Sequence, residues 1–441
     1  MLRTHKLKIR VTGKKAKVLG AMGYVGTKLW NTANWERRNQ WRTTGKIPNC
    51  VEQASELKNN KWYKQLPSQT AQAVLEKLEQ AYKSWYALRK KSSKARPPGF
   101  RPKQTLSSLI FKKSAFQIQG KLIRLSLAKN LKKNLDYPEQ YLWLPFKTYQ
   151  TIEGEPRILE LKYSQGHWVG YLVVNLAPPL STIQKKPKAL AIDQGIINLI
   201  AGITTEGETI IYSGKGLLSI QRYFNKEIAK TQHRIQSRVK DYAWNEGLAG
   251  YYHKKGRQIR QALHALAKDI INFCLDRGIQ IIVLGKLTHI RKKNDLGDKG
   301  NQKLHAWSFE QLAQTLRYKA EAVGILVEEV SERNSSKCCS TCGKKGSRCK
   351  RGLFKCQNKK CSEYSKPVNA DLNGARNILN RYLRMGLTAR KVLVGVLALP
   401  EIKRWNFHTW GSHKWKLKNC VSPSLRNLRP GNIPLVESSP I

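Results

Sequence analysis

A cluster of cysteines in the last third of the chain constrains the fold more than any other feature. Six of the nine cysteines lie between Cys338 and Cys361. They include two short pairs, Cys339 with Cys342 and Cys356 with Cys361, and 13 residues separate one pair from the other. Each pair can hold two thiolates on a tight turn, and the intervening loop can bring the pairs together, as tetrahedral zinc requires. The spacing therefore predicts a zinc ribbon with these four ligands.

The sequence leaves room for other ligand sets. Cys338 and Cys349 could replace a member of the set, and the second pair is spaced more widely than is usual. The alternative is a chance cluster of reduced thiols. Eight Lys or Arg and no acidic residue lie between Cys338 and Cys361, which favours contact with nucleic acid, although zinc ribbons can be purely structural. The remaining cysteines are isolated, as free thiols in a reducing cytosol would be: Cys50, Cys274 and Cys420.

The whole chain carries a large positive charge. Of 441 residues, 81 are Lys or Arg and 29 are Asp or Glu, which gives a formal charge of +52. A compact chain with this excess repels itself, so nucleic acid is the expected partner. Hydrophobic residues at 40% exclude a purely disordered basic tail. No apolar run approaches the roughly 20 residues of a membrane span, and the start lacks the apolar core of a signal peptide. A cytosolic protein without a membrane partner is expected.

The N-terminal quarter combines basic and aromatic residues. The first 110 residues hold 24 Lys or Arg against five Glu, with tryptophans between them. From Ser68 to Leu88 apolar residues recur at helical spacing, which predicts an amphipathic helix that runs into a basic cluster. Such a helix can present a face to a nucleic-acid backbone, and the alternative is a solvated face of a helical bundle. The candidate nucleic-acid contacts, two of them in the ribbon, are Lys14, Lys15, Arg37, Arg38, Arg89, Lys90, Arg101, Lys350 and Arg351.

The rest of the chain divides into a β-rich and an alternating part. Residues 105–180 show strand alternation and a hairpin signal, which predicts a small β-barrel or open sheet. If the basic N-terminal strand joins that sheet, the helical part is an insertion. From Ala189 onward the chain reads as a strand ending at Asp193, a hairpin, and then alternating helices and buried parallel strands. A final helix follows Asp371. This is the order of a ribonuclease H-like domain.

Two aspartates occupy positions suited to metal chemistry. Cleavage of a phosphodiester by two divalent cations needs several acidic ligands that converge on both ions. Asp193 ends the first strand, at the edge where parallel sheets keep their chemistry, and Asp371 opens the last helix. Each has a simpler interpretation: Asp193 as a turn or cap, and Asp371 as a charge that stabilises the helix dipole.

Several ordered motifs resemble those of one family. The string AIDQGIINLIAG (191–202) resembles the first RuvC motif of the TnpB nucleases of transposons and of the compact type V CRISPR effectors related to them. The stretch 301–327 is similar to the helix and strand before their zinc ribbon. SSKCCSTCG (335–343) resembles the start of that ribbon, and NADLNGARNIL (369–379) resembles the third RuvC motif. The resemblance covers about 186–383, and the predicted N-terminal helix and the PPGFRPK connector are also similar to the family.

The resemblance implies a catalytic set with one departure. Asp193 and Asp371 match the first and third catalytic aspartates. The family's second-motif glutamate usually ends the fourth strand, where this sequence has Gly285. The next parallel strand ends at Val330, and neighbouring strand ends are about 5 Å apart. The carboxylate of Glu332 could therefore reach the same metal, because Gly285 has no side chain to fill that space. Some family members resemble this arrangement. The alternative is an impaired or inactive site.

The resemblance implies an RNA-guided DNA endonuclease of a transposable element. It would cleave double-stranded DNA beside a short adjacent motif, with a guide RNA from the transposon end. Asp193, Glu332 and Asp371 would hold two Mg²⁺ or Mn²⁺ ions, and Zn²⁺ would be structural. A monomeric ribonucleoprotein in a prokaryotic cytosol is expected. The alternatives are a nuclease-dead, RNA-guided repressor and an unguided nuclease or resolvase.

The implied fold is multidomain α+β. An N-terminal β-barrel (wedge) domain would carry a helical recognition insertion, and a RuvC-like α/β domain would carry the inserted ribbon. The C-terminal segment is either a basic and aromatic nucleic-acid surface or a disordered tail. The expected boundaries are 1–20 with 105–183 for the wedge, 21–104 for the helical part, 184–337 with 367–383 for the RuvC-like domain, 338–366 for the ribbon and 384–441 for the tail.

Overall fold

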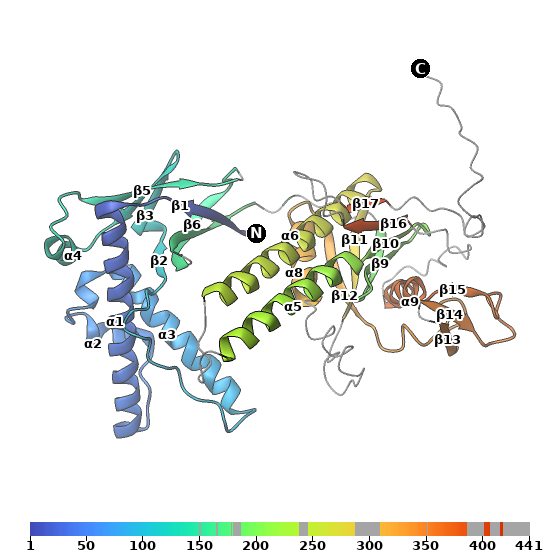
Figure 1. The fold of residues 1–441 in the computed structure, drawn as a ribbon, viewed down its shortest axis with the longest axis horizontal. Helices are drawn as coiled ribbons and strands as arrows, with labels where there is room; N and C mark the ends of the chain where they lie inside the picture. Colours follow the sequence, from blue (N-terminus) through green and yellow to red (C-terminus); the bar gives the residue numbers. More distant parts are fainter. Residues whose placement is uncertain are drawn as a thin grey trace, which may run out of the picture. The chain divides into compact units, whose positions relative to one another are not determined.

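The protein is α+β and divides into two compact units (Figure 1). The units are Met1–Ala177 and Pro178–Ile441. The computed structural model describes residues 1–149, 151–164, 166–177, 179, 187–237, 246–286, 309–350, 352–385, 401–405 and 415–417. None of the helices in these ranges is long and apolar enough to cross a membrane.

The first unit is built on a seven-stranded antiparallel sheet. Its strand order is β2-β6-β7-β1-β5-β4-β3, so the N-terminal strand lies in the middle. β2 and β3 lie at opposite ends of this order, yet only the 3-10 turn Lys113–Ala115 separates them in the chain. The sheet therefore curls until its edges approach each other. The bounds are β1 Leu2–Ile9, β2 Leu109–Lys112, β3 Phe116–Gln119, β4 Leu122–Ser126, β5 Tyr141–Lys147, β6 Glu155–Ser164 and β7 His167–Asn175.

The helices of this unit lie mainly between β1 and β2, as an insertion into the sheet. Their bounds are α1 Gly13–Thr44, α2 Cys50–Leu57, α3 Ser68–Arg89 and, after β4, α4 Lys129–Asn134. α1 begins inside the stretch 1–20 that the sequence assigned to the β-domain. Its glycines hide the helical pattern, and two of them serve packing. A Cβ on Gly23 or Gly26 would lie 3.1 Å from the side chains of Leu106 or Ser107, which cross the helix there.

The second unit contains a mixed sheet that is covered on both faces. Its order is β12-β11-β8-β9-β10-β16-β17, and the first three strands are parallel. Apolar runs buried on both faces form β8 and β11, whereas the edge strand β12 contains Glu328 and Glu329 and is mostly exposed. The hairpin predicted after Asp193 is confirmed by β9 and β10. The bounds are β8 Lys188–Gln194, β9 Asn198–Thr204, β10 Thr209–Ser213, β11 Ile279–Lys286 and β12 Leu326–Ser331.

Different helices cover the two faces of this sheet. α5 (Lys215–Gln236), α6 (Glu246–Asp276) and α8 (Phe309–Glu321) share a core with one face, which includes Leu190 and Ile192 of β8. α9 (Ala370–Met385) packs on the other face, against alternate residues such as Ala191 and Val283. Side chains alternate along a strand, so the residues two positions further on, Asp193 and Gly285, face α9.

Part of the C-terminal segment belongs to this sheet, which corrects its assignment to a tail. β16 (Glu401–Trp405) pairs in parallel with β10, and β17 (Trp415–Leu417) pairs with β16. Nζ of Lys403 lies 2.7 Å from Oδ2 of Asp269 on α6, and Trp405 is buried in the core. The sequence did not predict β16, because the strand is short and includes three charged residues, so it shows no clear apolar alternation. The rest of 386–441 lies outside the described residues.

A three-stranded antiparallel ribbon precedes α9. Its strands are β13 (Gly346–Lys350), β14 (Leu353–Cys356) and β15 (Pro367–Asn369), in that order. β15 runs directly into α9, whose first residue is Ala370. The ribbon is therefore an insertion between the strand β12 and the helix that covers one face of the main sheet.

Candidate metal centres

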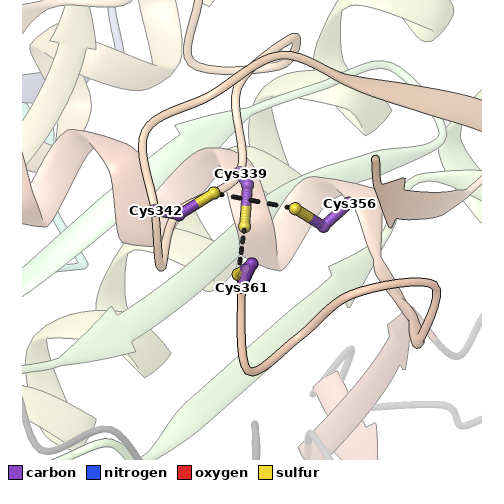
Figure 2. A group of neighbouring side chains, drawn as sticks. All are labelled: Cys339, Cys342, Cys356 and Cys361. Atoms are coloured by element: carbon purple, nitrogen blue, oxygen red, sulfur yellow. Dashed lines mark hydrogen bonds between the residues drawn. The ribbon is translucent and has the colours of Figure 1, made fainter. Parts of the chain in front are cut away.

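The four predicted cysteines meet in the ribbon. The Sγ atoms of Cys339, Cys342, Cys356 and Cys361 all lie within 4.8 Å of one another, and Figure 2 shows them pointing toward a common centre. The Cys339–Cys361 and Cys342–Cys356 sulfur distances are 3.9 and 3.6 Å. Four sulfurs at 2.3 Å from a tetrahedral zinc ion would be about 3.8 Å apart. The donor set and its spacing therefore fit zinc.

The cysteines of this group do not share one pKa shift. Burial, as the first cause, raises the pKa of Cys356 to about 12 and also raises the pKa of Cys361. Burial acts to raise the pKa of Cys342, but hydrogen bonds from the Lys344 backbone and the Asn358 side chain lower it to about 7. A thiolate is the form that binds zinc. Cys338 is half-buried and lies outside the four-sulfur group, and Cys349 is in β13.

Three carboxylates converge on the α9 face of the main sheet. In the paired strands, Ile192 is opposite Leu284, so Asp193 lies beside Gly285. Gly285 is in turn opposite Val330 of β12. Glu332 follows Val330 by two residues and therefore projects from the same face. Asp371 lies in the first turn of α9, the helix that packs on this face.

The neighbouring carboxylates act electrostatically on Asp193. Burial raises the pKa of Asp193 well above its usual range, and the negative charges of Glu332 and Asp371 raise it further, while Arg348 of β13 acts in the opposite direction. Burial also raises the pKa of Glu332 to about 7. Among the described residues, the buried Oε1 atom of Glu332 has no hydrogen-bond partner. A divalent cation would satisfy both the orphaned oxygen and the like charges.

Two glycines provide the space for this cluster. A Cβ on Gly285 would lie closer than 3.0 Å to Oε1, Cγ and Cδ of Glu332. A Cβ on Gly374 of α9 would lie equally close to Oδ2 of Asp193. The carboxyl group of Glu332 thus occupies the space beside Asp193 where a side chain of residue 285 would otherwise project.

Asparagines fix the third carboxylate, and sequence reasoning missed them. Asn198 is the first residue of β9, and its Nδ2 donates to Oδ2 of Asp371 at 2.7 Å. Oδ1 of Asn369 accepts from the backbone N–H groups of Asp371 and Leu372, at 2.9 and 3.1 Å, and so caps α9. Asn before a helix is a known capping signal, and it could have identified Asn369. Asn198 lies in the AIDQGIIN string, but only the fold brings it to Asp371.

The predicted nucleic-acid contacts differ in exposure. Lys14, Arg89 and Lys90 are exposed, and Lys15 is half-buried. The guanidinium of Arg89 lies over the rings of Trp41 and Trp85, of which Trp41 is exposed and Trp85 is buried, so a cation and one exposed aromatic ring lie together. Lys350 lies in β13, and Arg351 lies outside the described residues.

Three of the predicted arginines are engaged within the protein. Arg37 is 1% exposed, and its Nε donates to Oε1 of Gln53 at 2.6 Å, so the assignment of Arg37 to the surface is wrong. Arg38 is half-buried and donates to the Pro98 carbonyl at 2.6 Å. Arg101 is half-buried, donates to Oγ of Ser107 and stacks 3.7 Å from the Trp30 ring centroid. Arg38 and Arg101 hold the PPGFRPK connector against α1.

Comparison with known proteins gives consistent matches. The family model described as "Cas12f1-like, TNB domain" matches residues 309–378, and the one described as "Probable transposase" matches residues 172–291. A TnpB-like protein of Acidianus two-tailed virus, ORF457, is 25% identical over 418 residues, which cover 86% of each chain. The CRISPR-associated endodeoxyribonuclease Cas12f1 of Sulfoacidibacillus thermotolerans is 34% identical over 117 residues, 26% of this chain and 25% of that protein.

A solved structure shares the fold. The structure of Cas12f1 in complex with an sgRNA and target DNA aligns with a TM-score of 0.59 and 15% identity, and the alignment covers 84% of this chain and 82% of the other. At this coverage the aligned residues include parts of both units of the chain. Together with the sequence relatives, it confirms the resemblance of this chain to the TnpB family and its compact type V relatives.

Proposed function

We propose that this chain is an RNA-guided DNA endonuclease. It would use a transposon-derived guide RNA to bind double-stranded DNA beside a short adjacent motif and would cleave that DNA with two divalent cations. The name of the Cas12f1 relative, an endodeoxyribonuclease, supports a nuclease, and the sgRNA–DNA complex of the structural neighbour supports both partners. The observation that carries the proposal is the buried Glu332 oxygen beside Asp193, which lies in the space that Gly285 leaves and has no hydrogen-bond partner in the described part of the chain.

Each carboxylate has a distinct part in this proposal. Mg²⁺ or Mn²⁺, when bound, would activate a water molecule and stabilise the leaving 3′ oxygen. Asp193 and Glu332, in their ionised forms, would supply oxygen ligands from neighbouring strand ends. Asp371 would supply a third from α9, with its Oδ2 oriented by Asn198. Since burial favours the protonated forms of Asp193 and Glu332, cation binding would release protons.

The remaining parts would hold nucleic acid. The first unit would serve as wedge and recognition domains, and the ribbon as a zinc-bound, target-nucleic-acid-binding domain of the RuvC-like unit. A +52 chain suits a guide RNA and heteroduplex, because these neutralise far more basic surface than one duplex site does. Base pairing would read the sequence, and the protein would read backbone shape and the adjacent motif.

A library cleavage experiment tests the function. The protein would be coexpressed with its native flanking DNA, purified with any bound RNA, and incubated with Mg²⁺ and plasmids that carry a guide-matched target beside randomised bases. Linear product enriched for one adjacent motif, and lost in Asp193→Ala and Glu332→Ala, is expected. Binding of the same targets without cutting would instead identify a nuclease-dead repressor. Copurified RNA without a defined sequence would favour an unguided nuclease.

A further inference from the structure

The ribbon adjoins two of the three carboxylates. Glu332 is the residue after β12 ends, and the ribbon segment follows it directly. At the other end of the segment, β15 pairs with β14 and leads into Asp371 within two residues. The backbone N–H of Ala370 also donates to the carbonyl of Gly352, in the ribbon, at 2.9 Å. The ribbon is therefore joined to both carboxylates through short stretches of backbone.

One face of α9 holds the loop between Glu332 and the zinc site. Asn377 donates from Nδ2 to the carbonyls of Ser335 and Cys338, at 2.7 and 2.8 Å. Asn373, which is 1% exposed, donates to the Cys338 carbonyl at 2.8 Å and accepts from the Ser340 N–H at 2.9 Å. These amides bind backbone groups, so they fix the path of the loop independently of its side chains.

The loop itself is closely hydrogen-bonded. The N–H of Ser335 donates to the carbonyl of Glu332 at 3.0 Å, and the N–H of Cys338 donates to that of Asn334 at 3.1 Å. Arg381 of α9 donates to the carbonyl of Ser331 and, at 2.8 Å, to that of Arg333. The residues on both sides of Glu332 are thus tied to α9, and the loop continues to the first zinc ligand, Cys339.

We propose that Asn373 and Asn377 are positioning residues for the carboxylate cluster, and that through them the zinc ribbon sets the position of Glu332. This inference rests on the proposed function. The buried Oε1 of Glu332 has no partner among the described residues, so the loop backbone is what directs this carboxylate. Ligand positions matter to about 0.2 Å, and loss of a supporting hydrogen bond typically costs 10–100-fold in metal affinity or activity.

The test compares two asparagines of the same helix. Asn377→Ala removes two bonds to the stretch between Glu332 and Cys339. Asn380→Ala removes the 2.7 Å bond to the Ser340 carbonyl, beyond Cys339, and is the matched control. Mn²⁺ affinity would be measured by calorimetry on the full chain, with Glu332→Ala giving the background, and zinc content by mass spectrometry. The expected result is about 10-fold or greater loss of Mn²⁺ affinity in Asn377→Ala only, with zinc retained.

A second readout separates positioning from general destabilisation. In the guide-RNA complex, Asn377→Ala should raise the Mn²⁺ concentration for half-maximal cleavage while excess Mn²⁺ restores the rate. An unchanged Mn²⁺ affinity in Asn377→Ala, or an equal loss in Asn380→Ala, would overturn the inference. Failure of the proposed function gives a different result: the wild-type complex would not cleave guided targets, whatever the Asn377 variant does to Mn²⁺ affinity.

Discussion

Replacing Gly285 with alanine tests whether the position of Glu332 is essential to a metal site. The added Cβ would lie 2.5 Å from Cδ of Glu332, whereas ordinary contact begins at 3.4 Å. The carboxyl group must retreat by at least this difference, about 0.9 Å, and by more at Oε1, which would lie closer still. Even the smaller figure exceeds the roughly 0.2 Å tolerance of a metal ligand. A displacement of this size can cost about 100-fold in rate. The clash involves the end of a flexible side chain, so we expect little loss of stability.

Single-turnover cleavage of a guide-matched plasmid with Mg²⁺ is the assay. Gly256→Ala is the control, because a Cβ there, in α6, meets nothing within 4 Å. Guide-RNA and target binding should be unchanged in both variants. The double variant Gly285→Glu with Glu332→Ala, which moves the carboxylate to the neighbouring strand, should recover part of the lost activity. Wild-type cleavage by folded Gly285→Ala protein would refute the assignment of Glu332 as a ligand.

Further predictions follow from other contacts. Burial raises the pKa of Glu332 to about 7 in metal-free protein. The folded state therefore favours the protonated carboxyl group: this stabilisation is fully present below the unfolded pKa of 4.5 and is lost as the pH rises through 7. Glu332→Gln should therefore stabilise metal-free protein at pH 8, by at most about 3 kcal/mol, and chemical denaturation with a chelator at pH 5 and pH 8 measures this difference. Asn198→Ala should lower single-turnover guided cleavage by about 10–100-fold without loss of target binding; an unchanged rate contradicts the orienting bond to the aspartate. Cys356→Ser should eliminate bound zinc, measured by mass spectrometry, and one retained equivalent would disprove the four-cysteine site. Arg37→Ala should lower the melting temperature, whereas Arg89→Ala should leave it unchanged and weaken guide-RNA binding in a filter assay; the reverse pattern would contradict the burial of the first arginine.

The sequence predicted the features that depend on local pattern. A continuous apolar run identified the buried parallel strand β11, and pair spacing identified the four cysteines that meet in the ribbon. The interpretation of Gly285 and Glu332 combined the resemblance to the family with the spacing between neighbouring strand ends, and the structure places the Glu332 carboxyl group beside Gly285. The catalytic role of Glu332 remains a prediction.

Features that depend on long-range packing were not predictable in the same way. The burial of Arg37 follows from the approach of Gln53 across a helix pair, which no local pattern records. α1 begins earlier than expected, because its glycines obscured the helical pattern in the sequence. Two of these glycines allow close packing against Leu106 and Ser107, which only the fold reveals. The strand Glu401–Trp405 is recognisable only when its partner β10, about half the chain away, is known.

That last pairing has a consequence for biosynthesis. β10 is synthesised long before the strand that covers its edge, because β16 lies far beyond it in the sequence. Until then the nascent sheet exposes a hydrogen-bonding edge, which can pair with another chain. Products of premature termination should therefore aggregate.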